Sequence, residues 1–321
     1  MAKLKADECY STNYNDNYDP DPHIVPRRIK YNFFIPKDST IKKPFTISEA
    51  LKELFPGRYY HLPVPADPSE IVTLEAWRCS VCPSQQFVSD YGDSVVFPLQ
   101  KEDNITRVSK TLSYINAEGK KNIIVAFEST GILTGLLPCG RMDGAVLSLA
   151  LFTDEDSVWR LKSFAPALGY YGSFQDLSPI KLMKLGKDNY GLYFEDGVGP
   201  GGGPFIYTSY IFGLVGNKFE LLLRDWGSAQ CNSFANWDCK YKTDLSDTTR
   251  FGNLSVIMKG WYDKRDYDSM REIGVTFPDE LKQYLPKKDS LSFTITANYQ
   301  FRNGKYVFTT EKVKTRKFSV Q

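Results

Sequence analysis

The chain has 321 residues, of which 40 are basic and 38 acidic, and the two charges are mixed along its length. This balance leaves no broad positive field, so neither nucleic acid nor an anionic lipid surface is expected as a partner. No segment approaches the roughly 18 consecutive apolar residues of a transmembrane helix, so no membrane span is expected either. The 20 Tyr and 21 Phe favour pleated sheets, on which aromatic rings pack against cross-strand neighbours.

The first part of the chain is predicted to hold a tail and a helix. Residues 1–27 are too polar to form a core, and we interpret them as an N-terminal tail. Residues 46–55 predict a short helix, because Thr46 can cap the first turn and the apolar residues recur on one face. The Pro56-Gly57 pair that follows is a typical end signal.

From about residue 70 the sequence predicts successive β-hairpins, because apolar and polar residues alternate and turn residues recur at short intervals. Asn303-Gly304 is the strongest turn signal, since both central residues of a type I′ turn need positive φ. The predicted strand pairs are 145–152 with 158–164, 180–185 with 190–195, 207–214 with 218–223, and 291–301 with 305–312.

Between residues 120 and 225 the hairpins follow one another at intervals of roughly 30 residues, which predicts a mainly β fold of consecutive antiparallel hairpins in a β-propeller-like arrangement. A large β-sandwich is the alternative, and a few short helices accompany the strands. Residues 28–260 are expected to form the main β domain. Residues 261–321 are expected to form a C-terminal helical segment, at 266–273 and then 278–285, and a β-hairpin that packs on this domain.

The cysteines favour disulfide bonds and an oxidising compartment, because an even number of them lies in polar or Pro- and Gly-containing segments. The segment between Cys231 and Cys239 is a polar loop that a bridge would close. We therefore expect a periplasmic or otherwise extracytoplasmic location, although Met1–Lys5 does not begin a signal peptide. The candidate disulfide cysteines are Cys9, Cys79, Cys82, Cys139, Cys231 and Cys239.

No recognisable active site is found in the sequence. There are only two histidines, and His61 is interpreted as a hydrogen-bonded loop residue and not as a general base. The glycine-rich segment 197–204 precedes a predicted strand, whereas a phosphate-binding loop precedes a helix. The carboxylates at 154–156, 195–196 and 263–268 match no calcium-binding pattern. We expect a non-enzymatic protein with no cofactor and no metal.

Aromatic residues give the candidate binding site. Two groups lie in segments interpreted as loops, where rings with polar tips suit protein interfaces and sugar stacking. Packing in a core is the alternative role for the same side chains. The candidates are Tyr170, Tyr171, Phe174, Trp226, Phe234 and Trp237.

Residues 144–203 resemble exported proteins of Gram-negative bacteria whose function is unassigned. The resemblance lies in the segments LSLALF at 147–152, WRLKSF at 159–164, YYGSF at 170–174 and LGKDNY at 185–190. These are hairpin elements and carry no catalytic residue. The resemblance implies a periplasmic location.

Two functions are favoured by these observations, and a structural envelope protein is a third alternative. The first is a non-enzymatic, extracytoplasmic protein that binds another protein, such as an immunity or inhibitor protein directed against a secreted toxin. The second is a carbohydrate-binding or carbohydrate-degrading protein that uses loop aromatics and paired carboxylates. The alternating basic run Lys312, Lys314, Arg316 and Lys317 is interpreted as an edge strand whose charges block edge-to-edge pairing.

Overall fold

The chain folds into two compact units, each of which is described by itself. The first comprises the described part of Val25–Ile180 together with Leu214–Phe219, and the second comprises Lys181–Gly213 and the chain from Glu220 onward. A computed structural model describes residues 39–55, 58–67, 70–78, 85–88, 94–97, 104–131, 144–172, 177, 179–197, 205–231, 235–246, 251–263, 277–284 and 290–317.

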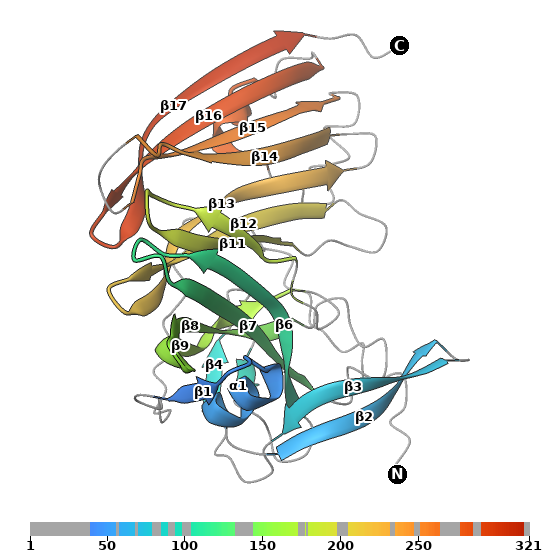
Figure 1. The fold of residues 1–321 in the computed structure, drawn as a ribbon. Helices are drawn as coiled ribbons and strands as arrows, with labels where there is room; N and C mark the ends of the chain where they lie inside the picture. Colours follow the sequence, from blue (N-terminus) through green and yellow to red (C-terminus); the bar gives the residue numbers. More distant parts are fainter. Residues whose placement is uncertain are drawn as a thin grey trace. The chain divides into compact units, whose positions relative to one another are not determined.

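The first unit contains an antiparallel sheet of seven strands in the order β1-β9-β8-β7-β6-β3-β2, and β4 and β5 pair separately (Figure 1). Most neighbours in this sheet are also neighbours along the chain, which confirms the prediction of successive hairpins. The bounds are β1 Thr40–Lys42, β2 Arg58–Asp67, β3 Glu70–Arg78, β4 Gln85–Val88, β5 Ser94–Phe97, β6 Asn104–Ile115, β7 Lys121–Gly131, β8 Ala145–Glu155 and β9 Val158–Tyr171.

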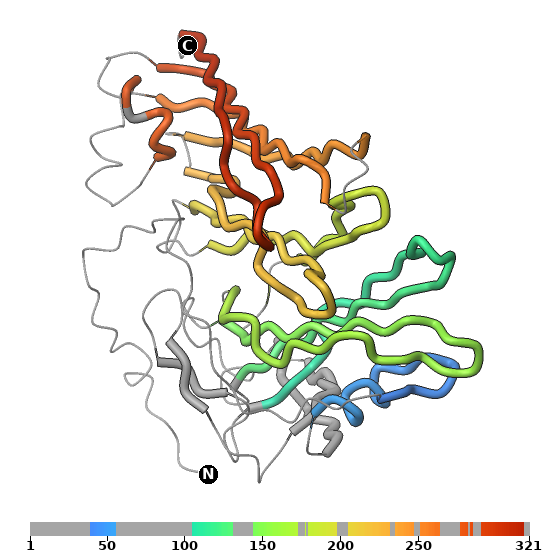
Figure 2. Tube along the Cα trace, turned by 90° about the vertical axis from the view of Figure 1, so that its left-hand side faces the viewer, coloured from blue at the N-terminus to red at the C-terminus, as the bar shows by residue number. Residues whose placement is uncertain are grey.

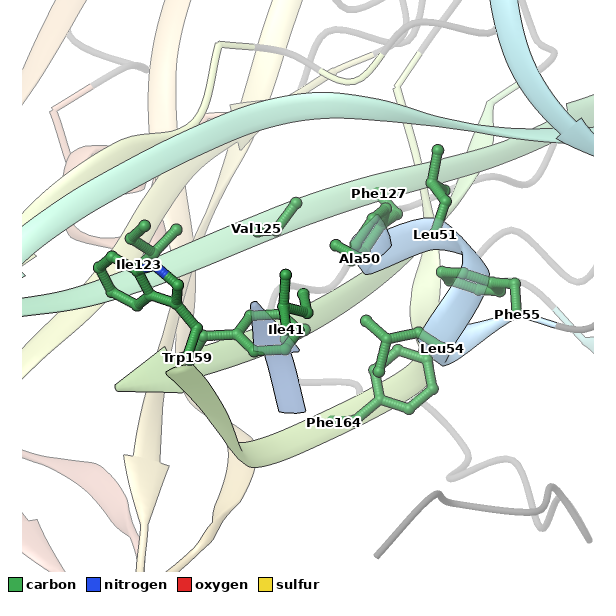
Figure 3. Packing of buried hydrophobic residues seen from close by; sticks show 12 residues of the cluster. Ile41, Ala50, Leu51, Leu54, Phe55, Ile123, Val125, Phe127, Trp159 and Phe164 are labelled. Atoms are coloured by element: carbon green, nitrogen blue, oxygen red, sulfur yellow. The ribbon is translucent and has the colours of Figure 1, made fainter. Parts of the chain in front are cut away.

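The predicted helix is confirmed as α1, Ile47–Leu54. Thr46 caps it, because its hydroxyl accepts a hydrogen bond from the Glu49 backbone N–H at 3.3 Å. The helix packs its apolar face on β7, β8 and β9 (Figure 3). The ring of Phe55 lies edge to face against two aromatic rings, Phe127 at 5.1 Å and Phe164 at 5.4 Å. These contacts form the core of the first unit.

The second unit is an antiparallel meander of eight strands, β10 to β17, in which every strand pairs with its neighbour along the chain (Figures 1 and 2). Asn303 and Gly304 both have positive φ, which confirms the predicted turn between the last two strands. The bounds are β10 Lys181–Lys184, β11 Tyr190–Asp196, β12 Phe205–Val215, β13 Lys218–Cys231, β14 Ala235–Thr243, β15 Leu254–Tyr262, β16 Leu291–Arg302 and β17 Lys305–Lys317.

A short helix, α4 (Asp279–Lys282), distinguishes the two faces of strands β14 to β17. Leu281 of α4 and the preceding Phe277 pack against Trp237, Phe293 and neighbouring side chains, and we call the face that they cover the inner face. The side chains of the intervening residues point to the opposite side, which we call the outer face. The helix predicted at 278–285 is therefore confirmed near its expected place.

Two expectations about the architecture are not shown by the structure. The propeller-like arrangement is not seen: propeller blades are sheets of four strands, whereas here consecutive hairpins join edge to edge into sheets of seven and eight strands. The predicted domain boundary at residue 260 falls inside β15, and all nine residues of β15 pair with β16. The C-terminal hairpin thus continues the sheet of the second unit. The sandwich alternative stays a prediction, and residues 1–27 and 266–273 lie outside the described ranges.

Glycine lets adjacent strands of the second sheet come close together. A Cβ on Gly260 would collide with the backbone carbonyl oxygen of Asn236 and with the Cβ of Trp237, both on the neighbouring β14. Backbone atoms cannot move aside as a flexible side chain can. We expect Gly260→Ala to destabilise the protein by about 1–3 kcal/mol, measured from urea unfolding curves. A midpoint equal to that of the wild type, with Thr294→Ala as the control, would contradict this packing argument.

Candidate binding surface

The two described cysteines do not form the predicted bridge. Cys231 and Cys239 are both free thiols. The register explains why: Cys231 lies opposite Ala235, and Cys239 lies four residues farther along β14, or about 14 Å at about 3.4 Å per residue. A disulfide needs Cα atoms within about 7 Å. Cys9, Cys79, Cys82 and Cys139 lie outside the described residues, so their pairing stays a prediction.

Both thiols are poor nucleophiles. Burial raises the pKa of Cys231 to about 12. Burial, with the nearby Glu195 carboxylate, also raises the pKa of Cys239 well above its usual range. The Cys239 thiol faces the carbonyl oxygen of Gly227 at 3.2 Å. Since the thiolate is the reactive form, these cysteines are structural residues.

We therefore expect Cys231 and Cys239 to resist alkylation by iodoacetamide in the folded protein and to react fully after unfolding in urea without a reductant. Peptide mass spectrometry with two isotopic forms of the reagent separates the two steps. Recovery of peptides cross-linked through either residue would contradict the free thiols.

The four described residues of the predicted aromatic site lie in strands. Tyr170 and Tyr171 lie in β9 and not in a loop, and Tyr171 is buried. Trp226 and Trp237 lie in β13 and β14, and Trp237 belongs to the core, where its indole N–H donates to Gly227 O at 2.9 Å. These two pairs belong to different units. A binding role for the partly buried Tyr170 and Trp226 stays a prediction, and Phe174 and Phe234 lie outside the described residues.

The other residues considered for catalysis or ligand binding lie in strands or form ion pairs. His61 lies in β2 and not in a loop. Phe205, just past the glycine-rich segment, begins a strand as expected, so no helix N-terminus is available there for a phosphate. Glu155 is paired with Lys162 at 2.6 Å and with Arg160 at 2.5 Å, and these partners lower its pKa to about 2.

A polar network crosses the inner face between β11 and β14, and Glu195 is its centre. Its carboxylate accepts hydrogen bonds from the Ser228 backbone N–H at 3.0 Å, from the Ser209 hydroxyl at 3.3 Å and from the Ser228 hydroxyl. Tyr241 donates to Ser209, and burial raises the pKa of this phenol well above its usual range. Because donors within the sheet already satisfy the Glu195 oxygens, we interpret this network as structural.

A second group of carboxylates lies near α4. Asp225 accepts hydrogen bonds from the Trp226 backbone N–H at 2.8 Å and from the Tyr299 hydroxyl. Burial, with the nearby carboxylate of Glu311, raises the pKa of Glu280 to about 6. Within the part of the chain that the structure describes, no group of three or more His, Cys, Asp or Glu is arranged to hold a metal ion.

The shifted pKa of Glu280 predicts a pH dependence. The folded state holds the proton more tightly than the unfolded chain, whose pKa is near 4.5, so the stabilisation by Glu280 is present at acid pH and is lost as the pH rises toward 6. Glu280→Gln should flatten this part of the curve of unfolding free energy against pH. Urea unfolding at several pH values measures it, with Glu53→Gln on α1 as the control. An unchanged curve for Glu280→Gln would contradict the shift.

The outer face of β14 to β17 gathers cations that are scattered in the sequence. Directly opposed residues of an antiparallel sheet lie on the same face, so the pairing of these four strands defines cross-strand rows. Six cations and one carboxylate occur in these rows, and all seven are exposed. The rows are Asn236-Trp261-Ser292-Arg316, Asp238-Lys259-Thr294-Lys314, Lys240-Ile257-Thr296-Lys312 and Lys242-Ser255-Asn298-Thr310.

The uncharged residues that β16 contributes to these rows make the arrangement of charges tolerable. Like charges directly opposite each other destabilise a sheet. Here Thr294 separates Lys259 from Lys314, and because strands lie about 4.8 Å apart, the two ammonium-bearing residues are about 10 Å apart. This distance is close to the screening length of about 8 Å at physiological salt. The face therefore keeps a high positive charge at little cost to the fold.

Hydrogen bonds across the outer face fix its polar side chains. Ser255 donates to Asn298 at 2.8 Å, and the Asn298 amide donates to Thr310 at 3.2 Å. At the other end, the Ser292 hydroxyl donates to the Arg316 carbonyl oxygen at 3.2 Å. The face is thus a preorganised array of hydroxyl and amide groups bordered by cations.

Sequence reasoning found one edge of this surface and missed the rest. The alternation of Lys312, Lys314 and Arg316 showed a charged strand face. Lys240, Lys242 and Lys259 lie on other strands, and only the register shows that they share that face. The alternation of Lys240 and Lys242 was the one available signal.

Comparison of the chain with protein-family models, with curated proteins and with solved structures gave no significant match. Neither of the helices in the described residues is long and apolar enough to cross a membrane.

Proposed function

We propose that this chain is a non-enzymatic, extracytoplasmic binding protein whose partner is an acidic protein, and that the outer face of β14 to β17 is its binding surface. The observation that carries the proposal is the concentration of six exposed cations on one face of a sheet, in a chain that is close to neutral overall. A positive patch steers an acidic partner and gives the contact its specificity.

The rest of the proposal rests on the sequence. The resemblance of residues 144–203 to exported proteins and the cysteines outside the described residues support an extracytoplasmic location. An inhibitor or immunity protein that blocks a secreted toxin is the form of protein binding that we favour. The internally satisfied network around Glu195 supports a non-enzymatic role, because its carboxylate is already occupied by hydroxyl and backbone donors.

A carbohydrate is the second candidate partner. The hydroxyl and amide side chains of β16 and the half-buried Trp261 favour it, because sugars are bound by such donors and acceptors beside an aromatic ring. A carbohydrate-degrading activity is less well supported on this surface. Its described rows contain only Asp238 as a carboxylate, whereas glycoside hydrolysis uses two.

Charge reversal on the outer face tests the proposal. We expect the double substitution Lys259→Glu and Lys314→Glu to weaken capture of an acidic partner from the native source by about tenfold or more, since it turns attraction into repulsion. The matched control is Lys110→Glu with Lys121→Glu, which reverses two exposed lysines of β6 and β7 in the first unit. Affinity capture with quantitative mass spectrometry, repeated at several salt concentrations, measures the effect.

The proposal requires that the captured protein be acidic, that binding weaken with added salt, and that the control variant behave as the wild type. Equal capture by the wild type and the outer-face variant would contradict it. If no protein partner is captured, and the wild type binds an acidic or neutral glycan in an array that the outer-face variant does not bind, the carbohydrate candidate is favoured.

A further inference from the structure

β17 is a long, open edge of the second sheet. It has 13 residues and forms the end of the eight-stranded order, so along one side of it no strand of the described residues pairs with its backbone N–H and C=O groups. Most of its side chains are exposed. Val307 and Phe308 are large hydrophobic residues with 43% and 49% of their surface exposed, and they lie on this strand.

The other end strands are protected from strand addition. β1 has three residues and β10 has four, which is too short to template a stable pairing. β2 is longer, but it contains Pro63 and Pro65, which have no N–H to donate. β17 contains no proline and is the longest end strand of the two large sheets.

The charges of β17 discriminate between possible strands. Lys312, Lys314 and Arg316 alternate along its outer face. A second copy of β17 would place cations opposite cations, which disfavours pairing between identical chains. An acidic strand would place carboxylates opposite the same cations, which favours pairing. Charge therefore disfavours pairing of β17 with a second copy of itself and favours its pairing with an acidic segment.

We propose that β17 binds an extended acidic segment of the partner, which pairs with it as an added strand. This inference rests on the proposed function and specifies how the acidic partner is held. Backbone hydrogen bonds would supply affinity, and alternate side chains would supply specificity, as in other cases of strand addition.

The register of β16 and β17 defines the segment. The pairing shifts between Asn298 and Tyr299, so that Thr309 is the extra residue of a bulge and its hydroxyl donates to Asn298 O at 2.9 Å. From Thr310 to Lys317 the register is regular. Over this length the cations recur at every second residue, about 6.8 Å apart. The partner segment should therefore carry Asp or Glu at every second position.

The intervening positions of the partner face the other side of the sheet. There they meet Glu311, Val313, Thr315 and Lys317, of which the central two share a face with Ile295 and Phe293 of β16. β-branched residues suit such positions because they pack well on a pleated surface. The expected pattern is an acidic residue alternating with Val or Thr.

A synthetic peptide tests this inference on the full-length protein. The probe alternates Glu with Val or Thr over the length of Thr310–Lys317 and carries a fluorophore. The first control has the same composition with its glutamates in one block. The second control has the probe's sequence with N-methyl groups on alternate backbone nitrogens, which removes donors from one edge while keeping every charge.

We expect the alternating peptide to bind in fluorescence anisotropy, and each control peptide to bind about tenfold or more weakly. Lys312→Glu with Lys314→Glu should abolish binding, whereas Lys240→Glu, three strands from the edge, should leave most of it. Hydrogen exchange at residues 310–317 should slow when the peptide is bound.

Several outcomes would overturn the inference. Equal binding of the alternating, blocked and N-methylated peptides would show attraction by charge without strand pairing, and the proposed function would survive. If no peptide binds, but charge reversal on the outer face still abolishes capture of the partner, the added strand is rejected and the proposed function survives. Concentration-dependent dimerisation that is lost on substitution of Lys314 would show instead that β17 pairs with a second copy.

Discussion

The pairing register of the second sheet is the constraint on which the other features of that unit depend. Because side chains alternate between the two faces of a strand, one register fixes which residues are buried against α4 and which are exposed. Trp237, Phe293 and Ile295 share the inner face. Lys240, Lys259 and Lys314 point the other way. A slip by one residue would bury the lysines, so the apolar core also holds the charged surface in place.

The same sheet separates charges of opposite sign. Glu195 and Asp225 lie toward the inner side, where hydroxyl and backbone donors satisfy them. Such donors stabilise a partly buried carboxylate without a buried ion pair, whose desolvation costs several kcal/mol. The cations, in contrast, remain in water on the outer face. The chain is nearly neutral overall, although this sheet carries carboxylates toward one side and cations on the other. The overall charge is therefore a poor guide to what this surface can bind.

The sequence predicted local features better than those that depend on distant residues. The helix at 46–55, the turn at Asn303-Gly304 and the hairpins were predictable because their signals are local. The way in which the hairpins combine into sheets was not predictable. Hairpins long enough to form a propeller blade can also pair edge to edge into one large sheet. Cys231 and Cys239 looked like a bridge because they are near in sequence, but the extended strand keeps them apart. The basic face needed the register of four strands.

The meander also bears on how the second unit is assembled during synthesis. Nearly all of its strands are joined by short connections, so each can pair soon after its neighbour is made. The longest connection, residues 263–290 with α4, separates β15 from β16, and closing it carries the largest loss of chain entropy. On this ground we expect the hairpin of β16 and β17 to dock after the other strands. The basic surface is complete only with this hairpin, because Lys312, Lys314 and Arg316 lie on β17.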